Sequence, residues 1–386
     1  MKRKTGKYVS ITVSEEKVNA FVPHPLPPKP ALILSEKLTE KLNTAEQKLA
    51  ELRVAAELVP NVDLFAYSFV RKESIFSSQI EGIQATLSDL LEFEASPEMS
   101  AENQDIVEVC NYLDALLYAK GQIADPKGLP ISLRLIRETH KRLMKKGRGS
   151  VKAPGEFRRT QNWIGGERPG KAHFVPPPPD MVEECLGNLE RFIHDERSNV
   201  DPLIKIGLLH VQFETIHPFL DGNGRLGRLL ITLLLESWKG LDARLLYLSL
   251  YFKKHQQEYY QRLDSVRSEG DWEGWTAFFL QGIAETSEEA KATAQQMFRL
   301  FEKDRQRIIS HAKVVIPAIR LFELLPSHPV VTIPMIVKQL KTTKPTAGKA
   351  VDFLVKLGVL QETSHTKRNR IFGYEGYLKI LKGIEN

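Results

Sequence analysis

The stretch HPFLDGNGRLGR, residues 217–228, brings a histidine, an aspartate, a glycine-rich turn and two arginines together. It runs directly into LLITLLL, residues 229–235, one of the most apolar runs of the chain. A segment that is apolar almost all round is typical of a buried helix. Arginines at the start of such a helix need anionic partners, because an unpaired charge is costly to bury. The stretch therefore predicts an anion-binding site where a helix begins.

The residue types in this stretch suit nucleotide chemistry. His217 can accept a proton near neutral pH. Asp221 offers carboxylate oxygens, which Mg²⁺ accepts together with substrate phosphates. The glycines at 222–224 let backbone N–H groups turn inward around an anion, and the positive end of the following helix adds to this. Arg225 and Arg228 lie three positions apart, so they share a helix face and can point at one polyphosphate. A single histidine, a single glycine-rich turn or a single pair of arginines usually has only a structural role. Their combination in one short stretch favours a functional site.

The whole stretch resembles the signature of Fic domains, His-Pro-Phe-x-(Asp/Glu)-Gly-Asn-Gly-Arg-x-x-Arg, at every fixed position. The resemblance extends upstream through GEFR, residues 155–158, and downstream through EYYQRL, residues 258–263, and covers roughly residues 60–300. It implies an all-helical Fic core and a nucleotidyltransferase that moves AMP from ATP to a protein hydroxyl. A phosphotransferase branch of the superfamily tends to lose the second arginine. Since both arginines are present here, AMP transfer is preferred.

The resemblance also implies a role for each residue of the motif. His217 would be the catalytic base that deprotonates a Ser, Thr or Tyr of a target, which the sequence does not identify. Asp221 would hold the Mg²⁺ that bridges the α- and β-phosphates. Arg225 would bind the β-phosphate and Arg228 the γ-phosphate, while Tyr260 would line the adenine pocket unless it is a core aromatic. The implied nucleotide-binding residues are Phe219, Asp221, Gly222, Asn223, Gly224, Arg225, Arg228 and Tyr260.

A second short stretch, SSQIEG at residues 77–82, lies ahead of this core. On a helix, Ser77 and Glu81 lie one turn apart and project the same way, and Gly82 ends the helix. An acid at a helix C-terminus is disfavoured by the helix dipole, so it needs another partner. The stretch resembles the inhibitory motif of Fic proteins, Ser/Thr-x-x-x-Glu-(Gly/Asn). This implies that Glu81 pairs with Arg228 and removes the γ-phosphate anchor. The alternative is that the same site removes AMP, with Glu81 orienting a water.

The rest of the pattern before residue 310 predicts a mainly α fold. Residues 1–34 look irregular, and Ser35 is a candidate cap for the first helix. Further helices are expected at 61–82, 103–120, 131–146, 180–196, 202–215, 224–239, 254–268 and 272–308. The best strand candidate is 158–175, predicted as a β-hairpin. By the resemblance this hairpin is the flap that aligns an extended target segment by strand addition, and a plain surface hairpin is the alternative.

Residues 311–386 differ from the rest of the chain in sequence pattern and in charge. Residues 311–386 carry twelve Lys/Arg against five Asp/Glu. Three short helices and a two-stranded ribbon with a basic tip predict a winged helix-turn-helix domain. Lys344 and Lys349 lie on its third helix, so DNA is one candidate partner and a protein is the other. The predicted domains are an N-terminal extension with the first helix (1–60), a Fic domain with an inhibitory helix near 62–82 (61–309), and the winged helix (310–386). The rival interpretation is a DNA-binding regulator with a Fic core as its sensor.

Composition and missing motifs exclude several classes. The chain has only two cysteines, Cys110 and Cys185, which argues against a disulfide framework. Residues 1–13 are basic but lack the apolar core of a signal peptide, and no apolar run approaches a membrane span. We therefore expect a cytoplasmic protein without a membrane partner. A P-loop and His-Glu-x-x-His are absent, and Glu-x-x-His at 214–217 and 362–365 is attributed to chance. A homodimer that restrains the inhibitory helix is compatible with the sequence, although no residue points to it.

Overall fold

The computed structural model describes residues 3–57, 62–96, 103–239, 245–311, 315–363 and 370–383. Its helices are α1 (Glu36–Glu57), α2 (Val62–Ile80), α3 (Leu87–Ala95), α4 (Gln104–Ala124), α5 (Leu133–Leu143), α6 (Pro179–Ile193), α7 (Pro202–Ile216), α8 (Asn223–Lys239), α9 (Ser249–Lys254), α10 (Gln256–Glu269), α11 (Trp272–Ile309), α12 (Ile316–Leu324), α13 (Ile333–Leu340), α14 (Lys344–Lys356) and α15 (Glu375–Lys382). The strands are β1 (Gly6–Val13), β2 (Glu16–Pro23), β3 (Val330–Thr332), β4 (Gln361–Glu362) and β5 (Ile371–Gly373). The expected mainly α fold is confirmed.

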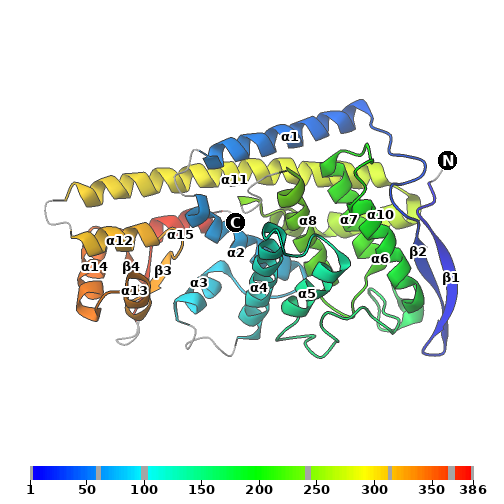
Figure 1. Ribbon diagram of the computed structural model, residues 1–386, viewed down its shortest axis with the longest axis horizontal. Coiled ribbons are helices and arrows are strands. Elements are labelled where there is room, and N and C mark those ends of the chain that lie inside the picture. Colours follow the sequence, from blue (N-terminus) through cyan, green and yellow to red (C-terminus); the bar gives the residue numbers. More distant parts are fainter. Residues whose placement is uncertain are drawn as a thin grey trace.

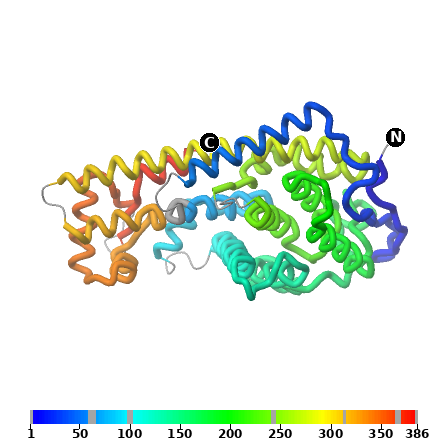
Figure 2. Tube along the Cα trace, turned by 45° about the horizontal axis from the view of Figure 1, so that its top comes forward, coloured from blue at the N-terminus to red at the C-terminus, as the bar shows by residue number. Residues whose placement is uncertain are grey.

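The long helix α11 joins the two ends of the molecule, and α1 lies along it (Figure 1). Both views show this pair on one side of the remaining helices (Figure 2). Ser35 caps α1 as expected, because its Oγ accepts the N–H of Leu38 at 3.3 Å. Two ion pairs, Lys48 with Glu288 and Lys291 with Glu51, join α1 to α11. Helix α11 contacts α7 and α10 at one end of the molecule and α12 and α15 at the other, so it connects the two ends.

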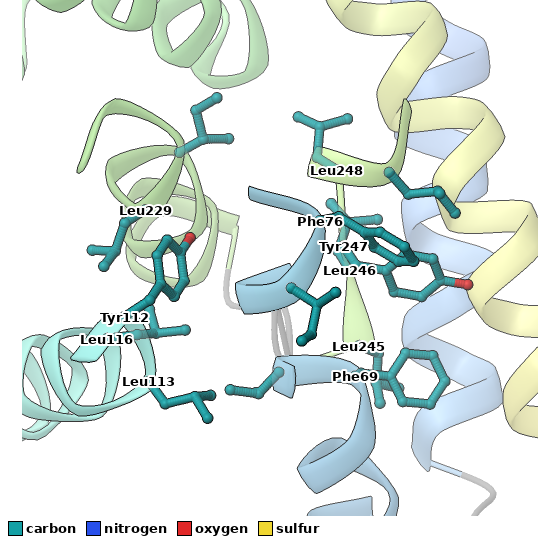
Figure 3. Packing of buried hydrophobic residues seen from close by; sticks show 14 of the residues in the cluster. Phe69, Phe76, Tyr112, Leu113, Leu116, Leu229, Leu245, Leu246, Tyr247 and Leu248 are labelled. Carbon is teal, nitrogen blue, oxygen red and sulfur yellow. The ribbon is translucent and has the colours of Figure 1, made fainter. Parts of the chain in front are cut away.

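The helix α2 lies in the interior rather than on the surface. Phe69 and Phe76 of α2 lie beside Tyr247, while Tyr112 of α4 and Leu229 of α8 approach from the other side (Figure 3). The buried face of α2 explains why its sequence repeats apolar residues at helical spacing. Its end, at Gly82, has φ of +86°, as the expected helix stop requires. The expected cap of this helix at Asn61 falls outside the described residues.

Two expectations about strands are wrong. Residues 6–23 were expected to be irregular but form the antiparallel pair β1–β2, whose turn residues Ser14 and Glu15 both have positive φ. Neither residue is Gly or Asn, so the turn carried no sequence signal. Residues 158–175 form one isolated bridge, Ile164 to Phe174, instead of a ladder. Consecutive glycines with positive φ and the short 3₁₀ turn Pro169–Lys171 interrupt strand pairing there.

The C-terminal module (316–382) contains the three expected helices, α12, α13 and α14, and a small sheet in the order β3-β5-β4. Strand β3 and helix α15 were not expected. The module meets the core where the hydroxyl of Thr332 donates to the carbonyl of Ala95 at 3.2 Å, and where Tyr374 donates to Asp304 at 2.9 Å. The basic tip at 364–369 lies outside the described residues, and the winged-helix assignment stays a prediction.

Among the described residues, no helix combines the length and apolar character that crossing a membrane requires.

Candidate active site

The expected site lies in the turn between α7 and α8. His217 ends α7 in the left-handed conformation, with φ of 48°, and its N–H donates to the carbonyl of Phe213 at 2.9 Å. The side chain of Asn223 then closes the turn, because it accepts the N–H of Phe219 and donates to the carbonyl of the same residue, both at 2.8 Å. Gly222 has φ of +75°, and a Cβ there would meet the sulfur of Met144. The turn is therefore rigid and opens at the N-terminus of α8.

Arg158, the last residue of GEFR, supports this turn from beneath. Its Nε donates to the carbonyl of His217 at 2.9 Å, and its Nη2 donates to that of Ile216 at 3.3 Å. Its backbone N–H donates to the carbonyl of Pro218 at 2.9 Å. Burial lowers the pKa of Arg158 to about 10, so it stays charged at neutral pH. The sequence pointed to Arg158 only through a resemblance, because all of its hydrogen-bond acceptors are backbone carbonyls, which carry no sequence signal.

His140 of α5 holds the other side of the turn. Its ring stacks on Phe219 with centroids 3.7 Å apart. Its Nδ1 accepts the N–H of Gly155 at 2.8 Å, so the proton lies on Nε2, which donates to the carbonyl of Asp221 at 2.9 Å. Phe219 is fully buried. Its ring therefore has a packing role, its backbone groups are bonded to Asn223, and its role in nucleotide binding stays a prediction.

The stability of this arrangement should depend on pH through His140. Burial lowers the pKa of His140 from 6.5 to about 4. Below about pH 6.5, His140 therefore binds a proton in the unfolded chain but not in the folded protein, and the folded state loses stability as the pH falls. His140→Phe keeps a ring against Phe219 but cannot titrate. Between pH 7 and 5 we expect the wild type to lose roughly 2 kcal/mol more free energy of unfolding than this variant. Urea unfolding at both pH values measures this, and equal losses in the two proteins would contradict it.

His217 itself is a neutral base at physiological pH. Burial lowers its pKa to about 4, the positive charges of Arg267 and Arg158 act in the same direction, and the backbone of Glu214 opposes them. The side chain is 21% exposed, so a substrate can reach the ring. A neutral imidazole beside an anion site can accept a proton from a hydroxyl.

Asp221 is positioned as a single carboxylate ligand. Its Oδ1 accepts the N–H of Gly222 at 2.7 Å, and its Oδ2 lies 3.1 Å from Nζ of Lys152. The described residues contain no group of three or more His, Cys, Asp or Glu side chains that could hold a metal. One half-buried carboxylate fits Mg²⁺, which is commonly held by one or two carboxylates and completed by substrate phosphates and water. Sequence reasoning missed Lys152, whose contact depends on the loop before GEFR.

The structure brings the second arginine of the motif to the expected acid. Nη2 of Arg228 lies 2.7 Å from Oε1 of Glu81 and 2.8 Å from the carbonyl of Ser77, and its Nε donates to Oγ of Ser77 at 3.0 Å. Burial alone would lower the pKa of Arg228, but the carboxylate of Glu81 outweighs it and the pKa lies above its ordinary value. A Cβ at Gly224 would collide with the same carboxylate. Glu81 therefore lies directly over the glycine turn.

The first arginine points elsewhere. Nη1 of Arg225 lies 2.9 Å from Oε2 of Glu108 on α4, and both side chains are buried. Nη2 of Arg225 contacts the sulfur of Met144 at 3.6 Å. Arg225 and Arg228 therefore bind different carboxylates, although their spacing suggested one shared anion. Sequence reasoning also missed Glu108, whose only signal is an acid within the apolar pattern of α4.

Tyr260 lies on the open side of the site. It is 47% exposed, whereas its neighbour Tyr259 is buried and shares a hydrogen bond of 2.8 Å with Nε2 of His210. The two tyrosine rings lie 5.2 Å apart. Tyr259 is therefore the core aromatic of this pair, and the ring of Tyr260 is available to stack on a base. Near it, the side chain of Gln256 donates to the carbonyl of Ile80, at the end of α2, at 3.0 Å.

Residues 130–235 match the model of the Fic/DOC family, and residues 39–120 match that of the Fic/DOC family N-terminal region. This chain is a Fic domain protein. The two matches enclose the turn at 217–228 and the segment 77–82 that contacts it. The motif and its acidic partner therefore belong to one family architecture.

Two Fic proteins from Drosophila are similar in sequence to part of this chain. The protein adenylyltransferase Fic of Drosophila grimshawi is 35% identical over 144 residues, which are 37% of this chain and 26% of that protein. The protein adenylyltransferase Fic of Drosophila mojavensis is 33% identical over 144 residues, again 37% of this chain and 26% of that protein. This chain thus spans only a minor part of these relatives.

Two solved structures share the fold. A Fic family protein from Desulfovibrio desulfuricans G20 has a TM-score of 0.58 at 22% identity, covering 89% of this chain and 97% of that one. A Fic domain containing signaling protein from Bacteroides thetaiotaomicron VPI-5482 has a TM-score of 0.51 at 18% identity, covering 66% and 97%.

Proposed function

We propose that this Fic domain transfers AMP from ATP to a Ser, Thr or Tyr hydroxyl of a target protein and of itself. The observation that carries the proposal is a neutral, partly exposed His217 beside a glycine turn at the N-terminus of α8. That helix end supplies backbone N–H groups and a positive dipole for phosphates. The 35% identity to a protein named as an adenylyltransferase supports the nucleotide and the reaction.

The geometry suggests a role in AMP transfer for each group of the site. Nε2 of His217 accepts the proton of the target hydroxyl while its oxygen bonds to the α-phosphorus. The bond from this phosphorus to the bridging oxygen breaks, and pyrophosphate leaves. The backbone of the turn at 222–224 stabilises the charge on the α-phosphate. Asp221 would hold Mg²⁺, which would neutralise phosphate charge when bound.

We also propose that Glu81 holds the enzyme in an inhibited state. Its carboxylate binds Arg228 and lies over Gly224, where the phosphates would need room. Ser77 binds the same guanidinium through two atoms, so Nε and Nη2 of Arg228 are held by Ser77 as well as by Glu81. A nucleotide must therefore displace Glu81 before Arg228 can bind its terminal phosphate.

The replacement Glu81→Gly tests both the activity and its inhibition. We expect self-modification with AMP to rise about 5- to 150-fold, the range of a typical coupling free energy between two states. Incubation with Mg²⁺ and α-labelled ATP, followed by intact-mass analysis, measures the transfer. Glu36→Gly, at an exposed position in the first turn of α1, is the control for loss of one carboxylate. Equal transfer by wild type and Glu81→Gly would remove the inhibitory role, and no transfer by either would remove the activity.

Other expectations remain proposals at this stage. Lys344 and Lys349 are exposed on α14, which supports contact of the C-terminal module with DNA or with an acidic protein surface. Removal of AMP through Glu81, a regulator with a Fic sensor core, a homodimer and a cytoplasmic location also rest on the sequence. The target protein is not indicated by any residue.

A further inference from the structure

We propose that Glu214 is a positioning residue for His217: its carboxylate orients the imidazole through Nδ1 and balances the charge that the ring takes up. This proposal rests on the proposed AMP transfer. Glu214 precedes His217 by three positions on α7, and its Oε2 lies 4.0 Å from Nδ1 of His217. The carboxylate is almost fully buried. The pair thus lies on the side of the ring away from the atom that meets the substrate.

Both members of the pair have unsatisfied polar atoms. Within the described part of the chain, Oε1 of Glu214 and Nδ1 of His217 have no hydrogen-bond partner. Buried polar atoms without partners are uncommon, and each requires an explanation, of which a catalytic role is one. The two residues lie one helical turn apart, and Oε2 of the same carboxylate is the oxygen that approaches Nδ1, at 4.0 Å.

Each of the other polar side chains of α7 has at least one hydrogen-bond partner, although Nδ1 of His210 has none among the described residues. Their partners are the carbonyl of Ile193 for Lys205, the hydroxyl of Tyr259 for His210, the carbonyl of His24 for Gln212, and Nε of Arg267 for Thr215. Glu214 is the acid that this helix buries without such a structural partner. A purely structural role would leave its burial unexplained, since a buried carboxyl costs stability unless it is bonded.

The opposite helix is shaped around this carboxyl. Gly227 of α8 faces Oε1 of Glu214, and a Cβ at this position would collide with it. The same Cβ would also lie 3.3 Å from the rings of His210 and Phe213. A glycine here lets the backbone of α8 approach closely enough to enclose Glu214.

Charged groups from three elements surround Glu214 besides His217. Burial raises its pKa to about 7, Arg228 of α8 and Arg267 of α10 lower it, and Glu81 raises it. The phenol of Tyr259 on α10 also faces it. Removal of Glu81 from the site would therefore favour ionised Glu214. The carboxylate would then be negative in the same state in which Arg228 is free for phosphate.

The chemistry requires a fixed orientation of the ring. With Nδ1–H directed at Glu214, Nε2 is free to take the proton of the target hydroxyl as the oxygen–phosphorus bond forms and pyrophosphate leaves. The resulting imidazolium lies against a carboxylate, which lowers its free energy. The backbone of Glu214 also faces the ring, and Glu214→Gln retains that contact while it removes the charge.

The first test compares Glu214→Gln with its parent in the Glu81→Gly background. We expect kcat for AMP transfer to fall roughly 10- to 100-fold, with KM for ATP changed less than about twofold. Because Glu81 raises the pKa of Glu214, the parent, which lacks Glu81, should lose rate as Glu214 binds a proton below about pH 7, and this loss should disappear in the variant. Glu214→Asp, which keeps the charge, should recover part of the rate. Glu183→Gln, on the exposed face of α6, is the matched control and should change neither parameter. An unchanged kcat and pH profile in Glu214→Gln would overturn the proposal.

A second measurement does not depend on AMP transfer. In protein with ¹⁵N-labelled histidine, the His217 signals, assigned with His217→Ala, should shift near pH 7 as Glu214 ionises. The shift should be absent in Glu214→Gln. The same behaviour in both proteins would exclude the pair. A shift that depends on Glu214 in a protein that transfers no AMP would support the pair and contradict the proposed function instead.

Discussion

His217→Ala in the Glu81→Gly background is expected to lower AMP transfer about 10²- to 10⁴-fold, the usual contribution of a positioned acid–base group. His217 is a neutral base, because burial and two nearby arginines lower its pKa to about 4. Arg158 and Phe213 hold its backbone, so removal of the ring leaves the turn in place. Transfer of label from α-labelled ATP measures the loss.

Nucleotide binding should survive this replacement. The imidazole is not among the groups expected to hold the triphosphate, so the Kd for ATP, measured by calorimetry with Mg²⁺, should change less than about threefold. His24→Ala, an exposed histidine far from the turn in sequence, is the control for loss of a histidine. Transfer by His217→Ala at more than about a tenth of the parent's rate would show that another group accepts the proton.

Glu108→Ala is expected to destabilise the fold by about 3–5 kcal/mol, because it leaves the buried guanidinium of Arg225 without its carboxylate. The pair is buried on both sides, at 5% and 3% exposure, so water cannot replace the lost partner. Oε1 of Glu108 also accepts the backbone N–H of Arg148 at 3.1 Å, and that bond would be lost as well. Urea unfolding of the wild type and the variant measures the difference.

A double replacement distinguishes the charge from the packing. Glu108→Leu with Arg225→Met removes both charges and keeps apolar volume, so it should recover most of the loss. If Glu108→Ala alone cost less than about 1 kcal/mol, Arg225 would have another partner in solution. Phosphate binding by Arg225 would then regain support, since the guanidinium would be free to turn toward the nucleotide.

The helices show how far local pattern predicts structure. Helix α7 begins at Pro202, directly after Asp201, whose side chain caps it, and it ends within one residue of the expected position. The short helices α3 and α9 were missed, because nine and six residues carry little periodicity. The β1–β2 hairpin was missed because its turn consists of Ser14 and Glu15, which seldom adopt positive φ.

By itself, the sequence determined the turn at residues 217–228. His217, Asp221 and the glycines lie in one short loop, and backbone geometry over a few residues keeps them together. The pairing of Glu81 with Arg228 was also expected, through a resemblance. Only the tertiary structure decided which groups from distant elements face this turn. Glu108 reaches Arg225 across 117 positions, and Arg158 reaches the carbonyl of His217 across 59. Such contacts follow from how helices pack, and no local pattern specifies which buried acid meets which buried cation.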